Sequence, residues 1–326
     1  MKSGKVPNGV LENIILKDIV NRRSEVFIGP GVGEDCSAVD LGGDICVLSS
    51  DPITGSTKDI GRLTVHINLN DLASSGAEPI GLMVTILAPD GASEKELAEI
   101  MNQINDTAKL TNVDILGGHT EVTTAVNKFV VMSTAIGKVK KERIVSTAGA
   151  QAGDSIIITK YAGLEGTAII VSEKVNELVN VLSDEEIKEA LSYFDELSVI
   201  PEGKISVDFG VNSMHDVTEG GILGAVWEVA EASGKGAQIN YDKIPVSGVT
   251  QKISSHYSID YLRLISSGSM IICCKNGAEL SRLLDEASIP NAVIGTITEK
   301  KDRIIIKDGQ SLIIDEPGSD ELYKVI

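Results

Sequence analysis

The sequence predicts an α+β protein of two domains, each built on a mixed or antiparallel sheet. Strand-like apolar runs and helical patterns are mixed in both halves of its 326 residues. They do not follow the strict strand-helix-strand alternation of a doubly wound parallel sheet. Between the halves, residues 138–153 are polar and small, which is typical of a crossover between domains. We therefore expect domains at residues 1–148 and 149–326, and the 42% hydrophobic content can fill two cores.

The first domain combines helical patterns with apolar runs of strand length. Helical periodicity occurs at residues 11–20 and 93–110, and Ser93 with Glu96 has the spacing of a capping box. Strands are expected at three apolar runs: DICVLSS from Asp44, GLMVTILA from Gly81 and KFVVMSTAIGKV from Lys128.

The second domain should begin with the strand SIIITK and end with a hairpin. In the hairpin, the runs RIIIK and SLIID flank Asp308 and Gly309, a dipeptide that favours a two-residue turn. Between these limits we expect helices at residues 183–194, 222–232 and 278–286, and strands near 270–274 and 292–297.

Composition restricts the partners of this protein. The formal charge is −18 and aromatic residues make up only 3%, so the surface repels phosphate backbones and offers few stacking platforms. No run of eighteen apolar residues occurs, the N-terminus does not resemble a signal peptide, and the four cysteines show no zinc-like spacing. We expect a cytoplasmic protein that binds neither nucleic acid nor membrane.

The stretch HINLNDLASSGAEPIG, residues 66–81, predicts a helix with an unusual polar stripe. At helical spacing, Asn68, Asp71 and Ser75 form one stripe, beside an apolar stripe that contains Leu69 and Leu72. An ordinary solvated face is the alternative, but such faces are usually filled with Lys, Glu, Gln and Arg. The helix has no Lys or Arg before Gly81, so the polar stripe indicates ligand binding.

Five stretches combine glycine or small residues with acidic residues: GPGVGEDCSAVD, SSDPIT, the NLND helix, GGHTEV, and HDVTEGGILG, which should open a helix. Each alone is an ordinary turn or helix cap. Together they predict an oxygen-rich Mg²⁺ site beside glycine N–H groups that can approach a phosphate. Neither standard nucleotide-binding fingerprint is present. The predicted acidic ligands are Asp35, Asp51, Asp71, Glu121 and Asp216.

These stretches resemble motifs of the AIR synthetase superfamily and keep their order along the chain. GEDCSAV is similar to its GDDAAV motif, LSSDPIT to its TTDS segment, and NLNDLASSGAEPI to its VNDLAxxGAxP helix. GGHTEV is similar to its GGD/ET or GDTKV turn, and HDVTEGG to its DVTGFG or DPTRGG segment. Within the superfamily, the layout is most similar to the hydrogenase maturation factor HypE.

The resemblance implies a homodimer in which the N-terminal sheets pair, an α/β C-terminal domain, and ATP in the cleft between the domains. It implies that Asp35, Asp51 and Asp71 bind Mg²⁺ and phosphate, with Asn68 and Asn70 as supporting donors. By the same motifs, the cofactor site includes Gly117 and Gly118, the metal ligands include His119 or Glu121, and the catalytic residues beside the acceptor are Asp216 and Glu219.

Three departures from the family pattern affect what can be transferred. His119 stands where the family has Asp or Glu, so either its imidazole ligates a metal or Glu121 takes that role. Glu219 replaces the Arg of the HypE-type segment. The printed sequence ends ELYKVI, with Ile326 at the position of the modified HypE cysteine, so we expect the acceptor to be a separate molecule.

The leading hypothesis is a Mg²⁺-dependent enzyme that uses ATP to activate an acceptor group by phosphoryl transfer or ATP-dependent dehydration. The acceptor is a small molecule or another protein. One alternative is a nucleotide-binding sensor or scaffold that turns over little ATP, which would need fewer metal ligands. Another is a small-molecule kinase similar to thiamine-monophosphate kinase, although its DISDGL motif is replaced here by HDVTEGG.

Overall fold

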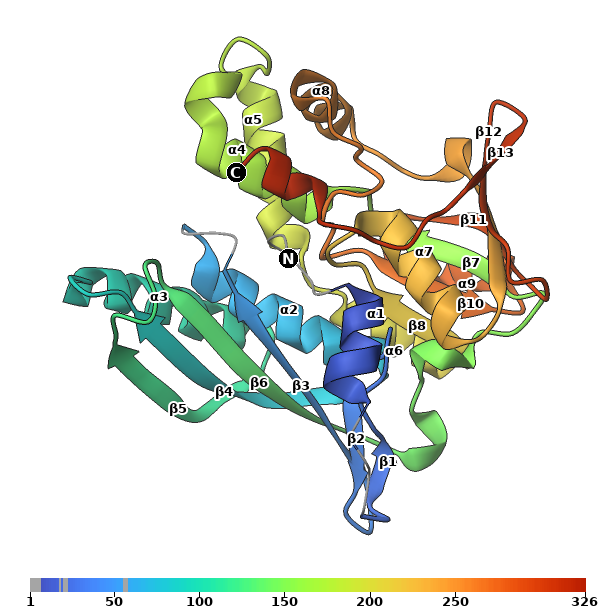
Figure 1. The fold of residues 1–326 in the computed structure, drawn as a ribbon, viewed down its shortest axis with the longest axis horizontal. Coiled ribbons are helices and arrows are strands. Elements are labelled where there is room, and N and C mark those ends of the chain that lie inside the picture. The colour runs from blue at the N-terminus through green and yellow to red at the C-terminus, as the bar shows by residue number, and fades with distance from the viewer. Residues whose placement is uncertain (1–6, 18, 20–22, 55–57) are drawn as a thin grey trace.

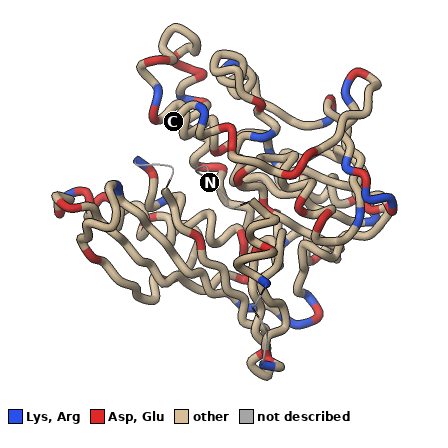
Figure 2. Tube along the Cα trace, in the orientation of Figure 1, with Lys and Arg blue, Asp and Glu red and all other residues tan. Residues whose placement is uncertain are grey.

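The computed structural model describes residues 7–17, 19, 23–54 and 58–326, and it confirms the predicted fold class. Two α+β domains lie side by side (Figure 1). Residues of both domains line a cavity between them. Acidic residues outnumber basic ones by 47 to 29, and both domains carry them (Figure 2). No helix among the described residues is both long and apolar enough to cross a membrane.

The first domain contains a six-stranded sheet with the strand order β1-β2-β3-β6-β4-β5. All neighbouring strands are antiparallel except β4 and β5, which are parallel. The helices α2 and α3 pack together, and α2 lies on β3, β4 and β6. The bounds are β1 Val26–Ile28, β2 Ser37–Asp40, β3 Ile45–Ile53, α2 Ile60–Ser74, β4 Glu78–Ala88, α3 Glu94–Leu110, β5 Asp114–Val122 and β6 Val130–Val139.

The second domain contains a seven-stranded sheet with the order β13-β12-β9-β11-β7-β10-β8. Only β9 and β12 pair in parallel. Apolar clusters lie on both of its faces, one with α7 and the other with α6 and α9. The bounds are β7 Ser155–Thr159, α4 Leu164–Leu178, α5 Asp184–Ser192, α6 Ile200–Phe209, β8 Ser213–Asp216, α7 Gly221–Ala232, β9 Gly236–Asn240, α8 Gly248–Tyr257, β10 Met270–Cys274, α9 Gly277–Glu286, β11 Asn291–Thr298, β12 Arg303–Lys307 and β13 Gln310–Ile313.

Local signals in the sequence located several elements correctly. Ser93 and Glu96 form the predicted capping box at the start of α3, with both reciprocal hydrogen bonds present. Asp308 and Gly309 connect β12 and β13 with positive φ angles of 51° and 73°, as a two-residue hairpin turn requires. The strand expected at 270–274 is β10.

Two other expectations about local structure were wrong, and a third was confirmed. The N-terminal helical segment consists of Asn8–Val10 and Leu11–Leu16, so it ends before residue 20; Ile19 lies outside a helix, and Val20 lies outside the described residues. GGHTEV, taken as a turn, forms the end of β5. Pairing with β4 decided this structure. HDVTEGG ends β8 with His215 and Asp216 and then leads into α7, which begins at Gly221 with Gly220 as its N-cap, so the predicted helix start is confirmed.

The two domains meet where α2 approaches α6. Gly76 ends α2 with φ = +78°, and a Cβ there would lie only 2.5 Å from Cγ2 of Val207. A Cβ on Gly203 of α6 would lie 2.5 Å from the carbonyl oxygen of Ala73. These contacts require glycine at both positions. The glycines thus let the polar helix α2 lie against the second domain, next to the candidate site.

Candidate functional site

Carboxylates from both domains line a cavity of about 440 Å³ between them. The described residues that line it include no Lys, Arg or His. Apolar walls come from α2, α4 and the last turn of the chain. The acidic lining residues are Glu34, Asp35, Asp51, Asp71, Glu165, Asp216 and Glu219.

Asp71 of α2 lies at the buried centre of this acidic group. The Ser49 hydroxyl of β3 donates a hydrogen bond to its Oδ2 atom. Burial raises the pKa of Asp71 well above its ordinary value, and the charges of Asp216, Asp51 and Asp35 raise it further. Four carboxylates therefore lie close enough to repel one another, and a bound cation would relieve that repulsion.

Asp35, His215 and Asp216 place potential ligand atoms within 4.8 Å of one another. His215 is buried, with Nδ1 2.8 Å from Oδ1 of Asp35 and Nε2 3.0 Å from Oε2 of Glu228 on α7. Burial lowers the pKa of His215, but the charges and hydrogen bonds of Asp35 and Glu228 outweigh this effect and raise the pKa well above its usual value. Both imidazole nitrogens are engaged by carboxylates in this arrangement, so the ligand atoms left to a metal are carboxylate oxygens, which suit Mg²⁺.

Asn68 and Asn70 are buried, and their amides bond to the protein's own backbone. Oδ1 of Asn68 accepts from the Asp51 N–H at 2.9 Å, and its Nδ2 donates to the Thr64 carbonyl at 2.9 Å. Asn70 donates to the carbonyl of Leu197 at 2.8 Å and accepts from the N–H of Val199 at 3.0 Å. The polar stripe of α2 is thus not solvated: Asn68 holds Asp51, and Asn70 joins the two domains. These bonds give both residues positioning roles, and their role as supporting donors to the nucleotide stays a prediction.

Gly117, Gly118, His119 and Glu121 do not join the carboxylates of the same chain. They lie on β5, and the register places Gly118 three strands from Asp51 along one row of the sheet, which corresponds to about 14 Å. His119 and Glu121 are exposed, with His119 Nε2 3.1 Å from Glu121 Oε2. A Cβ on Gly118 would lie 1.7 Å from the Val84 carbonyl oxygen, so the pairing of β4 and β5 explains this glycine. A single metal site within one chain that combines these residues with Asp51 is therefore inconsistent with the fold.

Asp216 and Glu219 line the same cavity, and the chain's last turn lies beside Glu219. The Tyr323 hydroxyl donates to Oε1 of Glu219 at 2.7 Å. The turn Glu321–Lys324 begins at Asp320, whose carboxylate accepts from the N–H groups of Gly220, Ile265 and Leu322 at 2.7, 3.1 and 2.8 Å. The last turn is thus a fixed wall of the cavity.

Sequence reasoning missed Glu165, His215 and Glu228. His215 precedes Asp216 in a stretch that had already been singled out. Glu165 and Glu228 stand within apolar helical sequences, in α4 and α7, and both are buried. A carboxylate inside an apolar run of a helix, as in LEGTAIIV and GILGAVWEVA, is the signal that could have found them, because such groups are rarely buried without a partner or a ligand.

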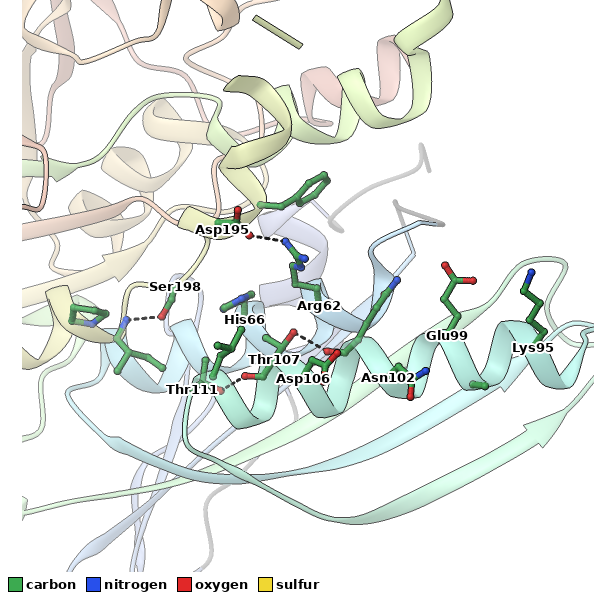
Figure 3. Close-up of a pocket in the computed structure, with 16 residues that line it drawn as sticks. Arg62, His66, Lys95, Glu99, Asn102, Asp106, Thr107, Thr111, Asp195 and Ser198 are labelled. Atoms are coloured by element: carbon green, nitrogen blue, oxygen red, sulfur yellow. Dashed lines mark hydrogen bonds and ion pairs between the residues drawn. The ribbon is translucent and has the colours of Figure 1, made fainter. Parts of the chain in front are cut away.

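A second cavity, of about 910 Å³, lies between α2, α3 and the segment before α6 (Figure 3). Arg62 of α2 pairs with Asp195 of the second domain at 3.0 Å. His66 lines this cavity, and burial, together with the charges of Arg62 and Lys160, lowers its pKa to about 4. His66 therefore faces a different cavity from Asp71, although both belong to α2.

The fold and the acidic cleft define a two-domain protein with a candidate carboxylate metal site between its domains. The chain belongs to the AIR synthase related protein family: residues 33–139 match its N-terminal domain and residues 151–307 its C-terminal domain. It is 30% identical to a putative hydrogenase expression/formation protein of Methanocaldococcus jannaschii, over 99% of this chain and 97% of that protein. It is 25% identical to carbamoyl dehydratase HypE of Escherichia coli, over 92% and 93%. A crystal structure of the hydrogenase maturation protein HypE in complex with ATP shares the fold, with a TM-score of 0.70, 20% identity, and coverage of 99% and 98%.

Proposed function

We propose that this protein is a Mg²⁺-dependent enzyme that uses ATP to activate an acceptor group by phosphoryl transfer or ATP-dependent dehydration. The observation that carries this proposal is the buried cluster of Asp35, Asp51, Asp71 and Asp216 in the interdomain cavity. The name of the Escherichia coli relative and the ATP complex of HypE support the same class of reaction.

Asp35, Asp51, Asp71 and Asp216 would hold Mg²⁺, because hard oxygen ligands suit this ion. A Mg²⁺ ion held there would supply positive charge that stabilises the negative charge developing during transfer. Neighbouring side chains hold these ligands in place. Asn68 accepts a hydrogen bond from the backbone N–H of Asp51, and the Ser49 hydroxyl donates to Asp71. His215 contacts the carboxylate of Asp35. The last turn of the chain lines the cavity beside Glu219 through Leu322 and Tyr323.

We also propose a homodimer formed through the uncovered face of the first sheet. Large apolar side chains on β4, β5 and β6 are 40–47% exposed: Ile80, Met83, Leu116 and Met132. An apolar surface of this kind on a sheet favours pairing with a second copy. A cytoplasmic location is supported by four cysteines that form no disulfide.

The nucleotide site is tested by the effect of MgATP on the melting temperature. A ligand at 100 times its dissociation constant stabilises the folded state by about 2.7 kcal/mol. We expect MgATP to stabilise the protein and Asp71→Asn to remove most of that stabilisation. Asp106→Asn is the matched control, because Asp106 is exposed on α3 and lines only the second cavity. Equally tight MgATP binding by the Asp71→Asn variant would show that Asp71 has no role in the site.

The enzymatic role is tested by incubation with labelled ATP and a pool of metabolites. We expect release of ADP, AMP or phosphate that depends on both the pool and Asp71. MgATP binding without any turnover would instead favour the nucleotide-binding sensor or scaffold.

A further inference from the structure

Glu165 of α4 is a buried carboxylate in the interdomain cavity. It is only 2% exposed and lines the cavity with Glu219 and Tyr323. Its Oε2 atom has no hydrogen-bond partner in the protein. An unsatisfied buried carboxylate oxygen costs free energy. A ligand that donates a hydrogen bond to Oε2 would remove this cost.

The charged residues that line the cavity with Glu165 are all acidic among those that the structure describes. Burial, together with the charges of Asp320 and Glu219, raises the pKa of Glu165 to about 7, although hydrogen bonding by Ser267 lowers it. Burial also raises the pKa of Asp320 to about 6, against the effect of the N–H groups it accepts from. No Lys, Arg or His is among the described residues that line this cavity.

The end of the cavity around Glu165 has an apolar wall and a second carboxylate held by a hydrogen bond. Ile169 of α4, Ile265 and Leu322 line the cavity beside the acidic groups. Glu219 is held by the Tyr323 hydroxyl at 2.7 Å. This end of the cavity thus places the carboxylate oxygens of Glu165 and Glu219 next to an apolar surface. An anionic acceptor would find no positively charged side chain there, whereas a cation with N–H donors could bond to Glu165 and Glu219 together.

We propose that the acceptor carries a cationic nitrogen group, an amine, amidinium or guanidinium, that binds Glu165 and Glu219 against the apolar wall of Ile265 and Leu322. The proposal rests on the proposed function only for the role of the bound molecule as acceptor. Binding of the cation depends on the end of the cavity around Glu165 alone, so it can be measured without nucleotide.

The test compares three probes of nearly equal shape: benzamidinium, which is cationic, benzamide, which is neutral, and benzoate, which is anionic. Dissociation constants are measured by ligand-observed NMR titration of the full chain without nucleotide. We expect benzamidinium to bind at least tenfold more tightly than benzamide, and benzoate not to bind. Glu165→Gln should weaken benzamidinium binding at least tenfold and leave benzamide binding nearly unchanged.

Glu99→Gln is the matched control, because it removes the same charge from α3, where Glu99 lines only the second cavity. It should leave all three dissociation constants unchanged. The proposal is overturned if benzamide binds as tightly as benzamidinium, or if Glu165→Gln and Glu99→Gln have equal effects. It is also overturned if Glu165→Gln weakens Mg²⁺ binding but not benzamidinium binding, since Glu165 would then be a metal ligand. The melting-temperature shift with MgATP is recorded separately, so failure of the nucleotide site is distinguished from failure of the acceptor site.

Discussion

The two sheets of this protein differ in how their faces are covered. In the second domain, consecutive residues of β10 are buried on opposite faces: Ile271 and Cys273 pack toward α7, whereas Ile272 and Cys274 pack toward α6 and α9. In the first domain, α2 and α3 lie on one face, while Met83 of β4 and Met132 of β6 are 43% and 40% exposed. The second sheet is complete within one chain, and the first has an apolar face that a second copy can cover.

The same difference applies to the functional residues. The second domain supplies buried side chains to the cleft, such as Asp216 and Glu165, from elements packed on both sides. The first domain supplies Asp71 from its covered face, but His119 and Glu121 lie on the exposed edge strand β5. The role of His119 and Glu121 therefore depends on whether a second copy of the chain lies against the first sheet.

The largest expected effect is on assembly. Met83→Lys would place a charge on the uncovered face of the first sheet, and in a two-fold dimer both copies would bury it. We expect sedimentation at micromolar concentration to change from about twice the 34.5 kDa chain mass to the mass of one chain. Ile313→Glu on β13 is the control, because Ile313 is 76% exposed in the second sheet. A monomeric parent protein, or a variant that remains dimeric, would contradict the proposed interface.

Truncating a side chain in each sheet should show that the second sheet is buried on both faces and the first on only one. Ile272 of β10 is fully buried, and Ile272→Ala should lower the free energy of unfolding by about 2–5 kcal/mol. Met83→Ala, measured by urea unfolding in the monomeric range of concentration, should cost less than about 1 kcal/mol, because its side chain is already half exposed. Equal costs at the two positions would show that the sheets do not differ in coverage.

Glu165 should make the stability of the second domain depend on pH. Its pKa in the folded state is about 7, above the ordinary value of 4.5. The folded state therefore holds the proton more tightly, and stability falls as pH rises from 4.5 to 7. Glu165→Gln should raise the free energy of unfolding by at most about 3 kcal/mol at pH 8 and have little effect near pH 4. Urea unfolding at both pH values, with Glu99→Gln as control, checks the sign; a loss of stability at pH 8 would contradict it.

The smallest expected effect concerns His119. If His119 bound the metal, affinity would fall steeply below about pH 6, where imidazole becomes protonated. Because β5 lies three strands from Asp51 in one chain, we expect His119→Ala to leave the pH dependence of Mg²⁺ binding unchanged in the monomeric Met83→Lys background. A flattened profile in this double variant, measured by calorimetry, would restore His119 as a ligand within one chain.

Much of the local structure and part of the candidate site could be predicted from the sequence. The capping box at Ser93 and the Asp308–Gly309 turn depend on residues a few positions apart, so their signals are readable in the chain. Asp35, Asp51 and Asp71 stood out because acidic residues recur beside glycines and small residues, and the structure brings them into one cavity.

The assignment of GGHTEV could not be made locally. The stretch has the composition of a turn, yet it forms the end of β5 by pairing with β4. Backbone hydrogen bonds to a distant strand outweighed the weak local preference for a turn. The parallel pairing of β4 and β5 also placed His119 away from Asp51, which no spacing along the chain indicates.

The sequence by itself determined the α+β class, the two domains and the carboxylates available to a metal, because these depend on composition, periodicity and short motifs. Only the tertiary structure decided which carboxylates lie in one cavity and which side chains bond to them. Asp35 and His215 are 180 residues apart, and they bond because β8 ends beside the segment before β2. Glu165 gained its raised pKa from burial against residues of three other segments. Burial and long-range contacts arise only when the elements pack, so the chemistry of these groups is set by the packed domains.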